Sequence, residues 1–191
     1  MRKLFVFITI VLLTISCSHK KYLEEVKNCM GQQITLFAEW SVIPRDTDTL
    51  LNDFMGTPVK MIVWYDSLSC ASCQVNRMYE WTDIVAYADS FAQWFSIIYL
   101  FTPKKEDLGR VNMALNVDNL DYPIFIDQNG SFVKQNSNLP KNRQLHSFLL
   151  DKNNRVVLVG SPLYNPSLWE LYMRTIQKMI DNDGVLPEQH Q

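Results

Sequence analysis

Two short apolar runs and an amphipathic segment between them predict a strand–helix–strand unit in the middle of the chain. Residues 59–65 and 95–101 are rich in branched and aromatic side chains, and each run is closed by polar residues or by proline. Runs of this length and composition are typical of buried strands. Residues 75–91 place an apolar side chain at every third or fourth position, which is the period of an amphipathic helix.

The carboxyl half predicts the remaining elements of a single sheet with helices. They are, in order, a helix over residues 104–116, a strand over 121–127, a hairpin over 147–160 and a helix over 166–181. Residues 131–143 are polar and predict irregular structure, and the tail from residue 182 is expected to fray. A strand–helix–strand crossover implies parallel pairing with a right-handed connection. The loop after residue 65 then lies at the carboxyl end of its strand, where open α/β sheets place their sites.

The chain begins with a segment that predicts export. An apolar run over residues 4–13 follows two basic residues, and it is too short to span a bilayer, which takes about 20 residues. We therefore expect residues 1–16 to be a signal peptide. Ser16 before Cys17 resembles the lipobox of bacterial lipoproteins, in which the cysteine carries the lipid, although Leu13 stands four residues before Cys17 instead of three. The alternative is an ordinary cleaved signal peptide with an incidental cysteine.

These features divide the chain into four parts. Residues 17–58 are expected to form the lipidated N-terminus and an extension, with a short helix over 20–30 and a short strand over 33–37. Residues 59–182 are expected to form one domain, since a chain of this length can bury a sizeable core. Residues 183–191 form the tail.

Charge and cysteine content exclude several classes of protein. The chain has 18 basic and 20 acidic residues, a formal charge of −2, and no basic patch that would favour nucleic acid or a charged membrane surface. Four cysteines, one of them the expected anchor, are too few for a disulfide-scaffolded miniprotein. We expect Cys29 to be a small buried residue; the alternative is an exposed thiol or an intermolecular link.

Cys70 and Cys73 stand where the predicted strand passes into the predicted helix. Cys70 falls at or just before the first helical turn, where unpaired N–H groups and the helix dipole favour a thiolate. Two cysteines at this spacing can close a disulfide with little movement, and the pKa of the N-terminal thiol can fall below its free value of about 8.5. We predict Cys70 as the nucleophile and Cys73 as the resolving thiol.

Two other interpretations of the pair stay open. One is an inert structural disulfide. The other is a metal site, but tetrahedral zinc needs two further Cys or His ligands, and the chain offers only Cys17, Cys29, His19, His146 and His190, without a second pair. The strand–Cys-x-x-Cys–helix context favours redox chemistry.

The order of elements resembles the thioredoxin fold, in the branch of peroxiredoxins and membrane-anchored TlpA-like thiol-disulfide proteins. The resemblance rests on the strand, Cys-x-x-Cys and helix of residues 59–91, on Tyr-Pro-Ile-Phe-Ile-Asp-Gln-Asn-Gly at 122–130, and on the hairpin Phe-Leu-Leu-Asp-Lys-Asn-Asn-Arg-Val-Val at 148–157. The whole chain is also similar to small lipoproteins with a Ser-x-x-Cys-x-x-Cys core. The resemblance implies a three-layer α/β fold with a mixed central sheet, flanking helices and an insertion of the peroxiredoxin/TlpA type.

The resemblance also implies site residues. Cys70 would attack a disulfide, or be attacked, through a mixed disulfide that Cys73 resolves. In the family a cis-proline before the hairpin contacts the substrate backbone, and residues 144–146 of this chain hold no proline at that place. Ser67 and Cys70 match the second half of the peroxiredoxin pattern Pro-x-x-x-Thr/Ser-x-x-Cys, whereas Val63 replaces its proline.

Two more side chains are candidates for the site. His146 lies on the loop that faces the cysteines in this fold, and it is either a surface histidine, a proton shuttle for Cys73, or a ligand of a Cu(I) site with both cysteines. Asp66 enters the site loop and either caps the helix, is simply solvated, or tunes the thiol.

The sequence thus predicts a lipid-anchored thiol-disulfide oxidoreductase that needs no bound cofactor and exchanges disulfides with protein thiols, one of them an unidentified redox partner. Two alternatives are a Cu(I)-handling chaperone that uses Cys70, Cys73 and His146, and a non-catalytic binding lipoprotein with a structural disulfide. We expect the protein at the cell envelope, anchored through Cys17 and facing the periplasm. Ser18 in place of an aspartate slightly favours the outer membrane.

Overall fold

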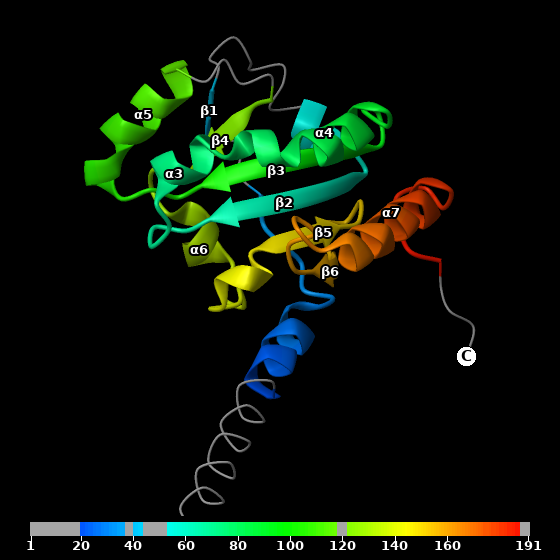
Figure 1. Cartoon of the computed structure of the whole chain (residues 1–191). Helices are drawn as coiled ribbons and strands as arrows, with labels where there is room; N and C mark the ends of the chain where they lie inside the picture. The colour runs from blue at the N-terminus through cyan, green and yellow to red at the C-terminus, as the bar shows by residue number, and fades with distance from the viewer. Residues whose placement is uncertain (1–19, 37–39, 44–52, 118–121, 188–191) are drawn as a thin grey trace, which may run out of the picture.

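A mixed six-stranded sheet organises the computed structural model, which describes residues 20–36, 40–43, 53–117 and 122–187 (Figure 1). The strand order is β1-β4-β3-β2-β5-β6. β2, β3 and β4 run parallel to one another, and β1, β5 and β6 pair antiparallel to their neighbours. The strand bounds are Ser41–Ile43, Val59–Tyr65, Phe95–Phe101, Ile124–Ile126, Ser147–Leu150 and Val156–Val159 for β1 to β6.

The apolar runs at residues 59–65 and 95–101 are confirmed as the central strands. β2 and β3 pair in parallel from Val59 opposite Phe95 to Tyr65 opposite Phe101. Nearly all of their side chains are buried, because helices or the N-terminal segment cover both faces of the sheet. Continuous apolar runs are what a strand buried on both faces requires.

The helix expected after the cysteines is divided. It consists of α3 (Ala71–Val75), a 3₁₀ turn η1 (Met78–Trp81) and α4 (Thr82–Asp89). Four of its buried side chains follow one another at intervals of three, which is the repeat of a 3₁₀ turn, and they are Val75, Met78, Trp81 and Ile84. A single α-helix with its repeat of 3.6 would rotate one of these residues out of the core.

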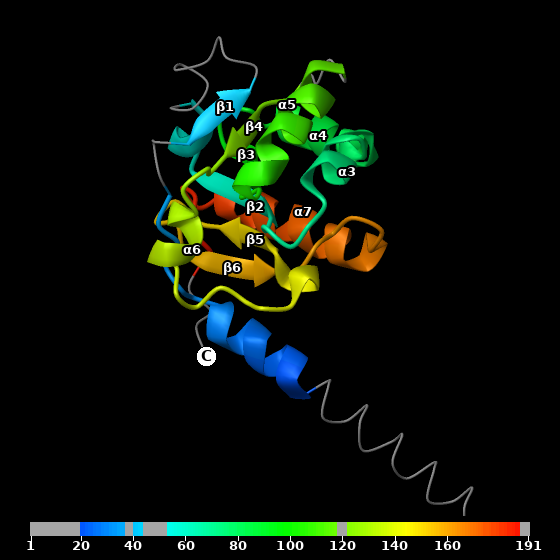
Figure 2. The same ribbon diagram turned by 90° about the vertical axis from the view of Figure 1, so that its left-hand side faces the viewer.

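The helices form a thick layer on one face of the sheet and a thin one on the other (Figure 2). α3, α4, α5 (Leu108–Val117) and α7 (Pro166–Ile180) bury their apolar sides with Met61 and Val63. Ile62 and Trp64 point to the opposite face, where they pack with α6 (Ser131–Gln135) and the N-terminal segment. The mixed three-layer α/β fold predicted from the sequence is confirmed.

Two predictions about weakly patterned segments need correction. Residues 131–143 are not wholly irregular, because the buried Asp127 carboxylate accepts hydrogen bonds from the backbone N–H groups of Ser131 and Phe132, at 3.0 and 2.8 Å, and starts α6. A strand was expected over residues 33–37; the described part, residues 33–36, forms only one bridge, between Gln33 and Arg155.

The N-terminal segment packs on the domain. Residues 20–29 are helical, as predicted, and Cys29 at the end of this helix is 1% exposed, which confirms its burial. The first turn after the helix pairs with β6, since the N–H of Gly31 donates to the carbonyl of Val156 at 2.8 Å. The expected signal peptide and Cys17 lie outside the described residues.

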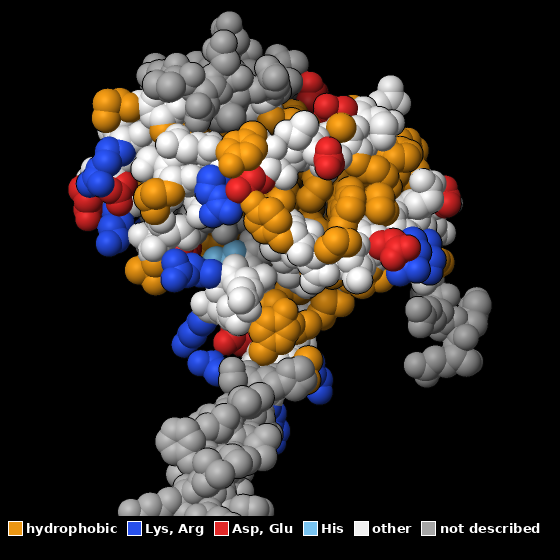
Figure 3. Space-filling view, in the orientation of Figure 1, with side chains coloured by type: hydrophobic (Ala, Val, Ile, Leu, Met, Phe, Trp, Pro, Cys, Tyr) orange, Lys and Arg blue, Asp and Glu red, His pale blue; other side chains and the backbone are white. Residues whose placement is uncertain are grey.

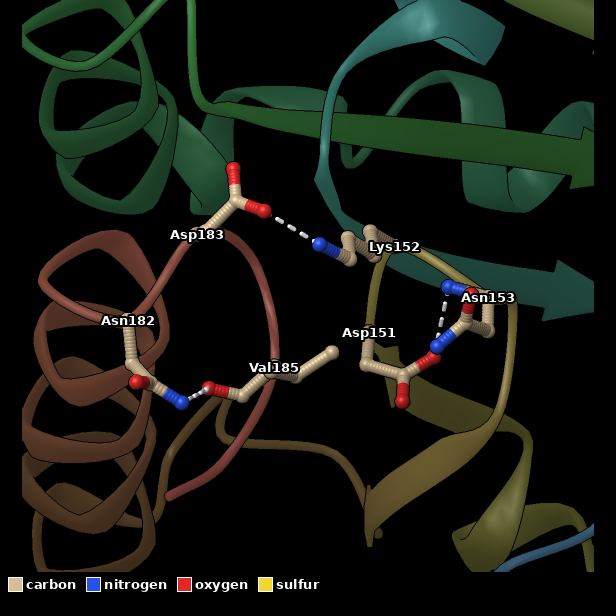
Figure 4. Close-up of polar contacts among 6 residues, drawn as sticks. All are labelled: Asp151, Lys152, Asn153, Asn182, Asp183 and Val185. Atoms are coloured by element: carbon tan, nitrogen blue, oxygen red, sulfur yellow. Dashed lines mark hydrogen bonds and ion pairs between the residues drawn. The ribbon is translucent and has the colours of Figure 1, made fainter.

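Residues 182–187, which follow α7, fold against the hairpin turn (Figure 4). The prediction that the tail frays from residue 182 is therefore wrong for this part, and residues 188–191 lie outside the described residues. Lys152 and Asp183 form an ion pair, and the N–H of Lys152 donates to the carbonyl of Gly184 at 2.9 Å. Asn182 Nδ2 donates to the carbonyl of Val185 at 3.1 Å. These contacts close the end of α7 onto the turn between β5 and β6.

Candidate active site

A disulfide joins Cys70 and Cys73 directly beyond the carboxyl end of β2, with 5.2 Å between their Cα atoms. Cys70 is the N-cap of α3, with extended backbone at φ −72° and ψ 92°, and its carbonyl accepts from the N–H of Gln74 at 3.0 Å. No side chain caps this helix start. The backbone N–H groups of the first turn are therefore available to a thiolate at Cys70.

Exposure does not separate the two cysteines, since both side chains are exposed. What distinguishes them is position: Cys70 precedes α3, whereas Cys73 lies inside its first turn. α3 has only five residues, so its dipole is weaker than that of the long helix expected from the sequence. The Oγ of Ser72 lies 3.8 Å from Cys70 Sγ.

Asp66 shapes the loop that delivers Cys70. Its Oδ1 accepts from the N–H of Leu68 at 3.2 Å and from the Oγ of Ser69 at 2.7 Å. The carboxylate thus holds the turn before the helix and does not cap the helix itself. Ser67, the other predicted auxiliary on this loop, is exposed and makes no hydrogen bond with any described residue.

His146 is a buried residue and not a surface histidine, with 5% of its area exposed. Its ring stacks on Trp64, with 4.0 Å between centroids, and its Nε2 lies 2.9 Å from the carbonyl oxygen of Pro140. Because a carbonyl oxygen only accepts hydrogen bonds, Nε2 carries the hydrogen. Burial lowers the pKa of His146, an effect that its hydrogen bond to Pro140 and the charge of Asp66 partly oppose. The imidazole is therefore neutral at pH 7.

An open cleft of about 360 Å³ lies beside the disulfide. Its lining includes Ser69 and Gln74, which directly flank the Cys70–Cys73 segment in sequence, and Gln144 and His146, while the two cysteines themselves lie outside the lining. The space-filling view shows that this side of the molecule, around α3, mixes charged and hydrophobic side chains (Figure 3). Such a cleft can hold a segment of another chain next to the exposed sulfurs.

Three of the residues that line the cleft, Arg77, Glu80 and Tyr164, form a polar cluster. Arg77 Nε donates to Glu80 Oε1 at 2.9 Å, and an Arg77 Nη donates to the hydroxyl of Tyr164 at 3.3 Å. Hydrogen bonds from Tyr164 and Arg77 lower the pKa of Glu80. Tyr164 has φ +61° while its side chain is 71% exposed. Left-handed backbone at a tyrosine is uncommon, and strain of this kind often marks functional sites.

No pattern in the sequence predicted this cluster. Tyr164 is 87 residues from Arg77, so no local pattern connects them. The one available signal was the turn composition around Tyr164, where Pro162, Asn165 and Pro166 predict a tight bend.

The described residues do not assemble the metal site that the copper alternative requires. Within residues 20–36, 40–43, 53–117 and 122–187, no three Cys, His, Asp or Glu side chains lie close enough to hold an ion. His146 Nε2 is hydrogen-bonded to the carbonyl oxygen of Pro140, and the sulfurs of Cys70 and Cys73 are joined in a disulfide. No observation supports Cys70, Cys73 and His146 as a ligand set.

Among known proteins, the chain is similar to solved structures only. No family model matches the chain, and no curated protein matches it by sequence. A solution structure from Bacteroides thetaiotaomicron, provisionally described as a protein disulfide isomerase, has a TM-score of 0.52 and 18% identity, over 80% of this chain and 90% of that one. The thioredoxin domain of a thiol-disulfide oxidoreductase from Bacteroides vulgatus has a TM-score of 0.47 and 15% identity, over 74% and 96%. An exposed lipoprotein thioredoxin from Streptococcus pneumoniae has a TM-score of 0.42 and 13% identity, over 62% and 88%.

The protein has a thioredoxin-like fold, as the sheet, its flanking helices and the first of these structures show. The fold carries a Cys70–Cys73 disulfide at the carboxyl end of a parallel strand. Of the helices that the structure describes, none combines the length and the apolar composition needed to cross a membrane.

Proposed function

We propose that the protein is a thiol-disulfide oxidoreductase in which Cys70 and Cys73 alternate between dithiol and disulfide. The observation that carries this proposal is the exposed Cys70–Cys73 disulfide beside an open cleft in a thioredoxin-like fold. A disulfide stabilises a fold most when it closes a long loop, whereas this one joins residues three positions apart and lies at the surface. Exposure makes both sulfurs accessible to thiol–disulfide exchange.

The reaction proceeds in two exchanges. In the reducing direction, the Cys70 thiolate attacks one sulfur of a substrate disulfide and forms a mixed disulfide, while the other substrate sulfur leaves as a thiolate. The Cys73 thiolate then attacks Cys70 Sγ, forms the Cys70–Cys73 disulfide and releases the second substrate thiolate. Two electrons pass to the substrate, whose sulfurs take up two protons, and a thiol reductant must restore the pair. The oxidising direction is the reverse.

The substrates that this site favours are protein thiols and disulfides. The cleft is open and is bordered by Tyr164, Arg77 and Gln144, which can pair with the backbone and side chains of an extended segment. The redox partner that recharges the pair belongs to the same chemical class, since it must reach the same two sulfurs.

The proposal includes attachment to the cell envelope. A signal peptide over residues 1–16 and a lipid on Cys17 would place the domain in the periplasm, with the outer membrane favoured by Ser18. Mass spectrometry of the mature N-terminus tests this part: a diacylated or triacylated Cys17 supports it, and a chain that is cleaved elsewhere or begins at Met1 contradicts it. Cys17→Ser should release the protein from the membrane fraction.

Dithiothreitol-coupled reduction of insulin tests the redox function. We expect turnover by the wild-type chain, its loss in Cys70→Ser, and full activity in Cys29→Ser, which removes a buried thiol remote from the pair. Absence of wild-type turnover would reject a general reductase.

The reduction potential of the Cys70–Cys73 pair shows whether the pair acts as a reductant, as an oxidant, or as a permanent structural disulfide. A value near about −270 mV indicates a reductase, one near about −120 mV an oxidant, and one below about −300 mV a structural disulfide in a binding lipoprotein.

A further inference from the structure

The helix over residues 20–29 touches the loop that precedes β5. Glu25 Oε2 on this helix accepts a hydrogen bond from the backbone N–H of Asn142 at 2.9 Å, across 117 residues of sequence. Both ribbon views place the helix beside the loop (Figures 1 and 2). The segment that would connect the domain to a membrane anchor therefore lies against the redox domain.

The loop over residues 140–146 is also tied to the site on its other side. The carbonyl of Pro140 lies 2.9 Å from His146 Nε2, and the carbonyl of His146 accepts from the N–H of Trp64 at 2.8 Å. An Arg143 Nη donates to the carbonyl of Leu68, two residues before Cys70, at 3.4 Å. One short loop therefore connects Glu25 with the turn that delivers the cysteines.

The same loop forms one wall of the cleft. Arg143, Gln144 and His146 line the cleft together with Ser69 and Gln74. The Asn142 side chain fixes the start of this wall, since its Oδ1 accepts from the N–H of Gln144 at 3.1 Å. The orientation of Asn142 thus sets the position of the wall relative to the cysteines.

We propose that Glu25 is a positioning residue of the redox site and that the helix over residues 20–29 acts as a clamp on the cleft wall. The proposal rests on the function proposed above. Glu25 touches neither the cysteines nor a substrate; it fixes the loop that a bound protein segment must contact. Movement of the N-terminal helix, for instance relative to a membrane anchor, is transmitted to substrate binding through this hydrogen bond.

Three variants of the full-length chain test the clamp. Glu25→Ala removes the acceptor, Glu25→Gln keeps an acceptor oxygen but no charge, and Glu24→Ala removes the neighbouring, exposed carboxylate of the same helix. Hydrogen exchange of the backbone amides that the loop over residues 140–146 contains, those of residues 141–146, reports on the loop. Insulin reduction and exchange with a small aromatic disulfide report on the site.

We expect Glu25→Ala to accelerate amide exchange over residues 140–146 about tenfold, as the loss of one hydrogen bond implies. It should raise KM for insulin about three- to tenfold with a smaller change in kcat, because the cleft wall and not the sulfur chemistry is disturbed. Exchange with the small disulfide should stay at the wild-type rate. Glu25→Gln should fall between wild type and Glu25→Ala, and Glu24→Ala should match wild type.

Equal amide exchange over residues 140–146 in Glu25→Ala and Glu24→Ala would overturn the clamp. So would faster exchange without any change in KM for insulin. If Glu25→Ala does not fold, the comparison of Glu25→Gln with Glu24→Ala decides. A wild-type chain that exchanges neither insulin nor the small disulfide rejects the proposed function, and the clamp is then judged by amide exchange alone.

Discussion

The imidazole of His146 lies on the indole of Trp64, with the ring centroids 4.0 Å apart and the planes inclined by 26°. The two residues are also joined through the backbone, since the N–H of Trp64 donates to the carbonyl of His146. Trp64 belongs to β2, which leads to the cysteines, and His146 immediately precedes β5. The stack therefore fixes the two chain segments that border the cleft.

The buried imidazole predicts that the protein loses stability in mild acid. Burial holds the pKa of His146 below its ordinary value of 6.5, so the unfolded chain takes up a proton at a pH where the folded one does not. The free energy of unfolding therefore falls as the pH drops through 6.5 toward the folded pKa, by up to about 1.4 kcal/mol per pH unit in that window. Denaturant titrations from pH 7.5 to 5.5 should show this slope, and His146→Gln should flatten it. The prediction would be contradicted if the free energy of unfolding depended on pH in the same way in the wild-type protein and in His146→Gln.

The fold could be predicted from the sequence where one physical signal dominates. The runs at residues 59–65 and 95–101 are buried on both faces, so their composition alone identifies them as strands. The division of the following helix was missed because spacings of three fit both an α-helix and a 3₁₀ turn over a short stretch. α6 was missed because its start depends on one buried carboxylate, Asp127, and not on a periodic pattern.

The site could be predicted only in part, for a related reason. Cys70 and Cys73 are local in sequence, so their spacing indicated the disulfide that the structure contains. The cluster of Arg77, Glu80 and Tyr164 and the contact of Glu25 with Asn142 join segments 87 and 117 residues apart. Contacts at such separations follow from packing of the whole sheet and leave no periodic trace in the chain.

Trapping of a mixed disulfide should identify the attacking cysteine. Solvent exposure cannot identify it, because Cys70 and Cys73 are both exposed. Cys70 precedes α3 and has the first-turn N–H groups in front of it, so we expect its thiolate to be the better stabilised of the two. We expect Cys73→Ser to accumulate a mixed disulfide with a protein substrate and Cys70→Ser to accumulate little, as measured by non-reducing electrophoresis. The opposite distribution would assign the nucleophile to Cys73.

Removal of the Asp66 carboxylate should loosen the turn before the cysteines. Asp66→Ala leaves the N–H of Leu68 and the hydroxyl of Ser69 without their common acceptor, at a cost of roughly 1 kcal/mol. Asp66→Asn retains an acceptor oxygen and should recover most of this stability. Ser67→Ala, in the same turn, is the control and should leave the free energy of unfolding unchanged. Chemical denaturation measures all three, and a stable Asp66→Ala would show that solvent replaces the carboxylate.

Cys29 should be chemically silent in the folded protein. It is 1% exposed, and burial raises the pKa of its thiol to about 11, so hardly any thiolate is present at neutral pH. Mass spectrometry after treatment with iodoacetamide should find Cys29 unmodified under native conditions and modified in denaturant. Rapid native labelling would mean that the contact between the N-terminal helix and the sheet opens frequently.

Gly184 should be the glycine least tolerant of substitution among those with left-handed backbone. It has φ +83°, and an added Cβ would lie 2.8 Å from the Cβ of Pro58 and 3.0 Å from that of Lys152, where Figure 4 shows the tail against the hairpin turn. Gly31 is the matched control, since its φ of +75° is similar but nothing lies within 4 Å of an added Cβ.

Gly31→Ala should therefore show the backbone penalty alone, about 1 kcal/mol. Gly184→Ala adds overpacking against two side chains close to their backbones and should cost about 1–3 kcal/mol more. Relief of this clash requires the tail to move away, which would break the hydrogen bond from the N–H of Lys152 to the carbonyl of Gly184. We expect the amide of Lys152 to exchange faster in Gly184→Ala only. Equal destabilisation of the two variants would mean that the tail adjusts freely and does not hold the hairpin to α7.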